Sequence, residues 1–356
     1  MSQMNIHNTV AGGPYLLNVW YAAAFSHEVT HEGPVARTIC GKHVVLYRTD
    51  AGEPVALQDR CVHRGVPLSA GGKVEGCAIR CPYHGLLFDD KGACVEIPGQ
   101  DRIPPTARVK SYPVVERDAL IWIWMGDPAL ADPATAPAYE YHSSDKWNYR
   151  TRTYDFAAGY LLLLDNLMDL THVGYVHKMV GGSENLHSDA RTTVGSDDRH
   201  EVVVSRQIAN CPAPPQYVNA LGHDGLIDRW QDIYFDPSRI WIWSGGQKAG
   251  TGALEGRREG AQFMTFHAIT PVDEGRSRYH FTVAWNFGLG NEELAEKMVA
   301  GADFTVREDK VIIEAQARRM QEDPDIFVDI RSDAGQINVR RALGRLFEAE
   351  AAGGHG

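Results

Sequence analysis

The chain has 356 residues and a mass of 39.4 kDa, with 44% hydrophobic and 23% charged residues, so it is long enough for two globular domains and unlike a disordered chain. Its 35 Lys and Arg against 46 Asp and Glu give a formal charge of −11, which argues against a nucleic acid or an anionic membrane as partner. Its longest apolar runs, 119–125 and 160–164, are far shorter than the ~20 residues of a membrane span, and its first twenty residues lack a secretory signal pattern, so we expect a cytoplasmic protein.

The first part of the chain, 14–138, contains short extended segments separated by turns, which is typical of a compact β domain. The predicted strands are His43–Arg48, Val55–Gln58, Ala78–Cys81, Leu86–Phe88, Tyr112–Val115 and Leu120–Met125. A segment with three prolines, 126–137, follows them and is typical of a linker. We therefore predict an all-β domain over 14–138.

The second part, 139–348, alternates between extended and helical patterns and predicts an α+β domain. The predicted strands of its antiparallel sheet are Glu201–Ile208, Arg229–Phe235, Arg239–Trp243, Phe263–Ile269 and Tyr279–Trp285. Helices are expected over 160–172 and 292–321. The Gly- and Ala-rich end, 349–356, is expected to be a flexible tail.

Two pairs of metal-ligand residues lie in turns of the predicted β domain. Cys61 and His63 form a CxH pair, Cys81 and His84 form a CxxH pair, and 17 residues separate His63 from Cys81. Two thiolates and two imidazoles can bind one tetrahedral zinc, or a [2Fe–2S] cluster in which two His replace two Cys on one iron. The spacing alone leaves both possibilities open.

A second constellation lies at the end of the first predicted helix and just beyond it, over 165–177. Its polar residues are Asp165, Asn166, Asp169, His172 and His177. Such groups in an apolar setting are costly unless something pairs them. On an ideal helix His172 and His177 are about 140° apart, so both reach one metal only if the helix bends or ends near Gly174. Asp165, Asp169 and His172 would lie along one stripe of that helix.

Two His and one carboxylate with open positions describe a non-haem Fe(II) site that activates oxygen. The second predicted helix offers Glu308, Asp309 and Glu314 as the carboxylate. Its helical period does not choose between Glu308 and Asp309, since each aligns with apolar neighbours.

The order of these motifs, a CxH and a CxxH pair followed by Asn-x-x-Asp-x-x-His-x-x-x-x-His, resembles the Rieske non-haem iron oxygenases over nearly the whole chain. Segments 112–127, 165–177 and 308–315 are similar to the vanillate and dicamba O-demethylase group and the toluenesulfonate methyl-monooxygenase group, and 94–100 strengthens the second likeness. The resemblance implies a Rieske domain followed by a catalytic domain of the helix-grip type. It also implies a [2Fe–2S] cluster on Cys61, His63, Cys81 and His84 and a mononuclear Fe(II) on His172, His177 and Asp309.

The resemblance further implies roles for two polar residues. Asp169 matches the acid that bridges a Rieske His of one subunit to an iron ligand of its neighbour, and Asn166 matches a nearby pocket residue. A head-to-tail homotrimer is therefore implied, since the bridge operates between chains.

The implied activity is that of the oxygenase component of a multicomponent monooxygenase. Electrons would come from NADH through a reductase with a flavin and a ferredoxin-type [2Fe–2S] centre. With O2, the enzyme would hydroxylate an aryl methoxy or methyl group of an aromatic acid, and O-demethylation would release formaldehyde. The alternatives at the same iron site are ring dihydroxylation and diaryl-ether cleavage.

A pocket for an aromatic acid needs apolar walls and one or two polar anchors, for which Gln231 and His267 on predicted strands are the candidates. Two readings from other classes compete with an oxygenase. In an electron-transfer or redox-sensing protein only the four Cys and His residues of the first constellation would function. In a zinc hydrolase, His172, His177 and Asp309 would bind zinc and turnover would need no oxygen.

Overall fold

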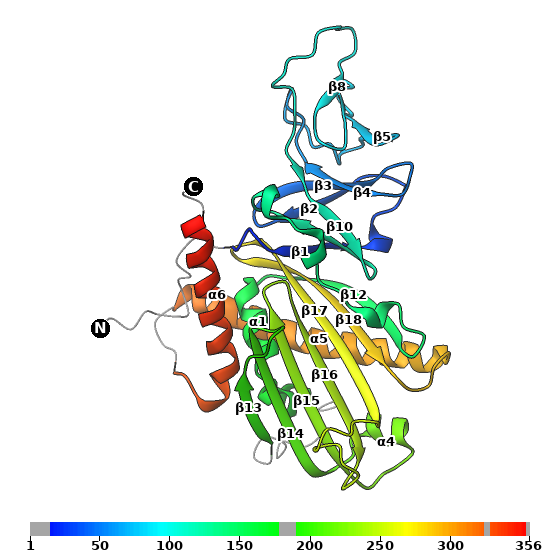
Figure 1. The fold of residues 1–356 in the computed structure, drawn as a ribbon, viewed down its shortest axis with the longest axis vertical. Helices are drawn as coiled ribbons and strands as arrows, with labels where there is room; N and C mark the ends of the chain where they lie inside the picture. The colour runs from blue at the N-terminus through cyan, green and yellow to red at the C-terminus, as the bar shows by residue number, and fades with distance from the viewer. Residues whose placement is uncertain (1–14, 178–189, 324–327, 354–356) are drawn as a thin grey trace, which may run out of the picture. The chain divides into compact units, whose positions relative to one another are not determined.

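The computed structural model describes residues 15–177, 190–323 and 328–353, which belong to two compact units (Figure 1). The N-terminal unit comprises Tyr15–Ala138 together with the short segment Thr270–Glu274. The C-terminal unit comprises the remaining described residues from Tyr139 onward. The chain thus passes from one unit to the other directly after the proline-containing segment.

Three small antiparallel sheets make up the N-terminal unit. The first has the order β1-β11-β10, with β1 (Trp20–Phe25), β10 (Val114–Arg117) and β11 (Leu120–Trp124). The second has the order β2-β3-β4-β9, with β2 (Val35–Ile39), β3 (Lys42–Arg48), β4 (Pro54–Gln58) and β9 (Ser111–Tyr112). The third has the order β5-β6-β7-β8, with β5 (Lys73–Glu75), β6 (Ala78–Arg80), β7 (Leu87–Phe88) and β8 (Cys94–Glu96). Short 3-10 helices lie at Ser26–Glu28, Pro128–Leu130 and Pro133–Thr135.

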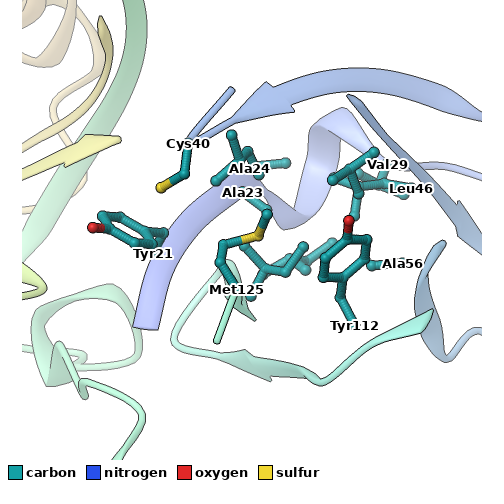
Figure 2. Packing of buried hydrophobic residues seen from close by; sticks show 13 residues of the cluster. Tyr21, Ala23, Ala24, Val29, Cys40, Leu46, Ala56, Tyr112 and Met125 are labelled. Carbon is teal, nitrogen blue, oxygen red and sulfur yellow. The ribbon is translucent and has the colours of Figure 1, made fainter. Parts of the chain in front are cut away.

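Two apolar clusters stabilise this unit. Figure 2 shows the first, in which Tyr21, Ala24, Leu46 and Met125 pack between β1, β3 and β11. The second cluster contains the buried thiols of the two metal-ligand pairs and is built from Val45, Tyr47, Val55, Leu57, Cys61, Leu68, Ile79, Cys81, Leu86, Phe88, Cys94 and Val109. The loops that carry those thiols are therefore anchored by packing.

The C-terminal unit is built on a seven-stranded sheet with the order β12-β18-β17-β16-β15-β14-β13. Its strands are β12 (Asn148–Phe156), β13 (Arg191–Gly195), β14 (Val202–Pro212), β15 (Leu226–Asp236), β16 (Arg239–Lys248), β17 (Ala261–Asp273) and β18 (Arg276–Trp285). Residues alternate between the two faces of each strand, and the register places Arg206, Gln231 and His267 on one face.

Helices cover that face of the sheet. The helical elements are η4 (Glu140–His142), α1 (Tyr160–Met168), η5 (Leu170–His172), α2 (Val173–Val176), α4 (Pro215–Leu221), α5 (Glu292–Glu322), η7 (Arg331–Asp333) and α6 (Ala334–Gly353). α5 packs against β12, α6 packs against β14, and α1 contacts both α5 and α6. The predicted fold class, a β domain followed by an α+β domain with a helix-flanked antiparallel sheet, is confirmed. None of the described helices is apolar over a length that would cross a bilayer.

The structure corrects two sequence expectations. The helix expected over 160–172 ends at Met168, because Asp169 adopts an extended conformation with φ −126° and ψ 99°. Residues 349–353, expected to be part of a flexible tail, are the last turn of α6. That helix is held in place because Val339, Leu343 and Phe347, spaced four apart, are buried. Residues 354–356 lie outside the described part of the chain.

Two candidate metal centres

The CxH and CxxH pairs of the N-terminal unit lie in two loops with the same backbone hydrogen bonds. The amide of Cys61 donates to the carbonyl of Val66 over 2.8 Å. The amide of Cys81 donates to the carbonyl of Leu86, also over 2.8 Å. Each loop thus returns to its cysteine five residues later and presents the residues between as an exposed tip.

Glycines make these two loop turns possible. Gly65 and Gly85 have φ values of +74° and +75°, which side chains other than hydrogen rarely allow. The turns bring the imidazoles of His63 and His84 together, with ring centroids 4.5 Å apart and an interplanar angle of 65°. Both rings are exposed. The loops therefore offer one imidazole each at the same place on the surface.

The two cysteines lie beneath the imidazoles and are buried. Burial raises the pKa of the Cys61 thiol, and the neighbouring Cys81 thiol adds to that shift. A buried pair of thiols is a poor thiolate source by itself, but a bound metal deprotonates its thiol ligands. An inner thiol pair and an outer imidazole pair fit a two-iron cluster with Cys on one iron and His on the other.

The C-terminal unit contains a compact group of three ligands. The ligand atoms of His172, His177 and Asp309 all lie within 4.8 Å of one another. Oδ1 of Asp309 is 3.1 Å from Nε2 of His177 and 3.5 Å from Nε2 of His172. The two rings are nearly perpendicular, with an interplanar angle of 80°. Two imidazole nitrogens and a carboxylate oxygen thus converge on one point, which fits a 2-His-1-carboxylate site with open positions.

Hydrogen bonds fix how both rings are oriented. Nδ1 of His172 donates to the backbone carbonyl of Asp169 over 2.7 Å, and Nδ1 of His177 donates to Oε2 of Glu308 over 2.9 Å. These bonds place a proton on Nδ1 of each ring, so each Nε2 is the atom that could bind a metal at the shared point. In this structure Nε2 of His177 faces the Asp309 carboxylate.

The interruption after α1 explains how residues five apart in sequence reach one point. The carboxylate of Asp169 accepts from the amide of Thr171 at 2.8 Å and from its hydroxyl at 2.9 Å, and so caps the 3-10 turn η5. The expected break near Gly174 is wrong, because that residue lies inside α2. The expected stripe of Asp165, Asp169 and His172 is also broken, and Asp165 instead forms an ion pair with Arg340.

The pKa shifts of the two histidines have opposite signs. Burial lowers the pKa of His172 and favours its neutral form, which is the form that binds metals. Burial also acts to lower the pKa of His177, but hydrogen bonds to Asp309 and Glu308 outweigh it, so the pKa of His177 is raised. A cation bound between these groups would displace the proton of His177.

Helices α1 and α5 supply the remaining groups of this site. The Asn166 amide donates to Oδ1 of Asp309 over 3.3 Å. Glu308 and Asp309, between which the helical period could not choose, both contact His177, on opposite sides of its ring. Asp309 reaches the convergence point, whereas Glu308 orients the ring.

The predicted substrate anchors lie on the helix-covered face of the sheet, and both have protein partners. Oε1 of Gln231 accepts from Nη1 of Arg206 over 2.7 Å. His267 contacts the hydroxyl of Tyr279 through Nδ1 and that of Thr265 through Nε2, the latter at 2.7 Å. Burial lowers the pKa of His267 to about 3, so its imidazole is neutral. Their role toward a substrate stays a prediction.

Arg206 is a functional candidate that the sequence reasoning missed. It lies in β14, where Val202, Val204 and Ile208 are its buried neighbours on the same face. A single arginine at a core-facing position of an otherwise apolar alternation is the signal that could have revealed it.

Two family models match the chain. The Rieske [2Fe-2S] domain matches residues 19–113, and the vanillate O-demethylase oxygenase C-terminal domain matches residues 156–349. The iron-sulfur subunit TsaM1 of the toluene-4-sulfonate monooxygenase system of Comamonas testosteroni is 40% identical over 95% of this chain and 99% of its own. The vanillate O-demethylase oxygenase subunit of Pseudomonas sp. (strain HR199 / DSM 7063) is 36% identical over 94% of this chain and 95% of its own.

Solved structures of dicamba monooxygenase also match along the chain. The enzyme bound to 3,6-dichlorosalicylic acid superposes with a TM-score of 0.88 at 32% identity, covering 96% of this chain and 100% of that one. Its structure with non-haem iron and dicamba superposes with a TM-score of 0.77 at 31% identity, covering 96% and 99%.

Proposed function

Because the chain belongs to the Rieske non-haem iron oxygenases of the vanillate O-demethylase type, we propose that it hydroxylates an aryl methoxy or methyl group of an aromatic acid. The observation that carries the proposal is the presence, in one chain, of a loop pair suited to a two-iron cluster and a convergent His-His-Asp site. Neither an electron carrier nor a sensor needs the second site. A hydrolase does not need the first.

The residues of the two centres have separate tasks. Cys61, His63, Cys81 and His84 would hold the [2Fe–2S] cluster, and His172, His177 and Asp309 would hold the mononuclear Fe(II). When bound, these groups supply electron storage and oxygen activation, which no side chain can provide. Glu308 and the Asp169 carbonyl keep the imidazole protons on Nδ1, and the Asn166 amide steadies the Asp309 carboxylate.

The product follows from the chemistry of the hydroxylated carbon. Hydroxylation of a methoxy group gives a hemiacetal, which collapses to a phenol and formaldehyde, so oxygenation appears as O-demethylation. A hydroxylated aryl methyl group has no such leaving group and is retained as the alcohol. The names of the relatives, which act on vanillate, dicamba and toluene-4-sulfonate, motivate both substrate types.

We infer that the working enzyme is a head-to-tail homotrimer. The exposed tip of the Rieske loops carries apolar side chains beside the imidazoles, with Val62 44% and Tyr83 62% exposed. The C-terminal unit exposes Phe304 and Val311 on α5, near the iron ligand in the same helix, and Tyr175 between the two histidines. Such apolar surface at both centres suits contact between a cluster of one subunit and the iron site of the next.

Asp169 is suited to join the two centres in that trimer. Its backbone carbonyl holds the His172 ring, and its carboxylate is partly exposed at the start of η5. An imidazole of a neighbouring subunit that donated to this carboxylate would be linked to the proposed iron ligand His172 through Asp169 alone. The bridge would fix the electron path between subunits.

Electrons would enter from a separate reductase that carries a flavin and a ferredoxin-type [2Fe–2S] centre and oxidises NADH. Because NADH is a cytoplasmic reductant, the proposal also places the reaction in the cytoplasm.

Formaldehyde release tests the proposal directly. The purified chain, a competent reductase, NADH and O2 are incubated with a panel of methoxybenzoates, and formaldehyde and the phenol are measured. Equal amounts of both, absent under nitrogen, are expected. A cis-diol product would support ring dihydroxylation instead, phenol pairs from a diaryl ether would support ether cleavage, and turnover without oxygen would indicate hydrolysis.

A further inference from the structure

Arg206 is a buried arginine without a carboxylate partner. Its side chain lies on the helix-covered face of the sheet and the residue is only 4% exposed. Within the described part of the chain, no Asp or Glu oxygen lies within the 4.0 Å that defines an ion pair with it. Burying a cation without an anion costs free energy, so such an arginine is unusual unless a ligand supplies the charge.

Two other arginines of this unit show the contrast. Arg340, which is buried, is paired with Asp165, and Arg258, which is half-buried, is paired with Asp232. Asp169 is the acid whose charge acts on Arg206, but it forms no ion pair with it. The two carboxylate oxygens of Asp169 accept hydrogen bonds from Thr171. Desolvation lowers the pKa of Arg206; the charge of Asp169 acts against that shift, and the neighbouring guanidinium of Arg229 adds to it. Arg206 therefore carries a buried positive charge on this face of the sheet that forms no ion pair with a described residue.

The hydrogen bonds of Arg206 leave one edge of its guanidinium available. Nη1 uses both of its protons, one toward the carbonyl of Leu170 at 3.0 Å and one toward Gln231 at 2.7 Å. Nε is buried and has no hydrogen-bond partner, and Nη2 donates to no described residue. The edge formed by Nε and Nη2 is the one that binds a carboxylate or sulfonate with two parallel hydrogen bonds.

The place of Arg206 relates this edge to the iron site. The carbonyl of Leu170 accepts from Arg206, and the preceding carbonyl, of Asp169, accepts from the iron-ligand candidate His172. Two successive carbonyls of one 3-10 turn thus hold the arginine and the ligand ring. An anion on Arg206 would lie on the sheet side of the metal site, where a substrate ring could extend toward the iron.

We propose that Arg206 binds the anionic group of the aromatic substrate, a carboxylate or a sulfonate, through Nε and Nη2. Gln231 is then a positioning residue, because its side chain accepts from Nη1 and so orients the Nε and Nη2 edge of Arg206 away from Gln231. The inference rests on the proposed function and deepens it, since it makes a negative charge on the substrate a requirement for binding.

The test is equilibrium binding by calorimetry under nitrogen, with the metal-loaded protein and without reductase. The probes are 4-methoxybenzoate and toluene-4-sulfonate, each compared with its neutral amide. A charge-assisted hydrogen bond contributes about 1.5–3 kcal/mol, so the preferred anion should bind roughly 10- to 100-fold more tightly than its amide. Equal binding of anion and amide to the unsubstituted protein would overturn the proposal, whatever the variants do.

Variants separate a ligand-binding role from a structural one. Arg206→Gln should lower the binding affinity for the anion by roughly 10- to 100-fold and leave the affinity for the amide nearly unchanged. Arg278→Gln is the control, because it removes the same charge from the opposite face of the same sheet, where Arg278 pairs with Asp155. If Arg206→Gln weakens anion and amide equally, Arg206 is structural and the proposal fails. If the anion preference is absent while formaldehyde is still released, only this inference falls and the proposed function stands.

Discussion

The carboxylate of Glu308 lies 2.9 Å from Nδ1 of His177, on the opposite side of the ring from Asp309. In the proposed iron site it would act without reaching the metal, by fixing the tautomer that leaves Nε2 for the iron. Replacing Glu308 with Ala should lower the affinity of the mononuclear site for Fe(II) by roughly 10- to 100-fold, as is typical for loss of such a partner. Chelator competition measures this affinity. Glu296→Ala, at an exposed position of the same helix, is the control and should not change it.

Asp309→Ala should remove the mononuclear iron and leave the cluster. Without the carboxylate only two neutral imidazoles remain at the convergence point, which is too weak a donor set to retain Fe(II). Iron analysis should fall from about three atoms per chain to about two, with an unchanged Rieske absorption spectrum. Loss of the Rieske spectrum as well would show that the substitution disrupts folding rather than one site.

Asp169→Asn separates the capping of η5 by the Asp169 side chain from the negative charge of that side chain. Asn is as good an N-cap as Asp, and the backbone carbonyl that holds His172 is unaffected, so both metals should stay bound. The reduced Rieske centre should nevertheless reoxidise more slowly with substrate and O2, by roughly tenfold or more, because the bridge to the neighbouring subunit loses its charge. Stopped-flow absorbance measures that rate, and a normal rate would exclude a bridging role.

Gly85→Ala should destabilise the cluster loops. The residue has φ +75°, and an added Cβ would lie 3.0 Å from Cγ of Pro98. Gly99→Ala is the control, because it introduces the same backbone strain at φ +74° where nothing lies within 4 Å of the added Cβ. The difference between the two variants gives the cost of the contact with Pro98. We expect about 1–3 kcal/mol of destabilisation from the strain in both variants, and a further loss of cluster content only in Gly85→Ala. Thermal unfolding and Rieske absorbance give the two readouts.

The buried His267 should make the protein sensitive to acid. Its pKa of about 3 in the folded state is below its ordinary value near 6.5, so below pH 6.5 the unfolded chain takes up a proton that the folded chain does not. Its neutral form is compatible with folding above pH 6.5, and stability falls as the pH drops from 6.5 toward 3. Urea unfolding at pH 7 and pH 5 should show a smaller loss for His267→Gln than for the unsubstituted protein. An equal loss in both would assign the acid sensitivity to other groups.

The sequence alone indicated the two groups of candidate metal ligands, because metal chemistry restricts which residues appear at such short spacings. CxH and CxxH pairs in turns point to the loop pair of Cys61 and Cys81, and the strand patterns predicted an all-β first domain and an antiparallel sheet in the second. The resemblance to a known family selected Asp309, and the structure places that side chain with His172 and His177.

Only the tertiary structure decided how these residues are oriented. The chain breaks at Asp169 rather than near Gly174, because a local carboxylate cap outweighs the helical pattern of the flanking residues. The proposed roles of Glu308 and Arg206 likewise rest on contacts with segments 131 and 36 positions away in the sequence. Periodicity reports which face of an element is buried, but hydrogen-bond partners distant in sequence are set by packing, and they determine what a buried polar group can do.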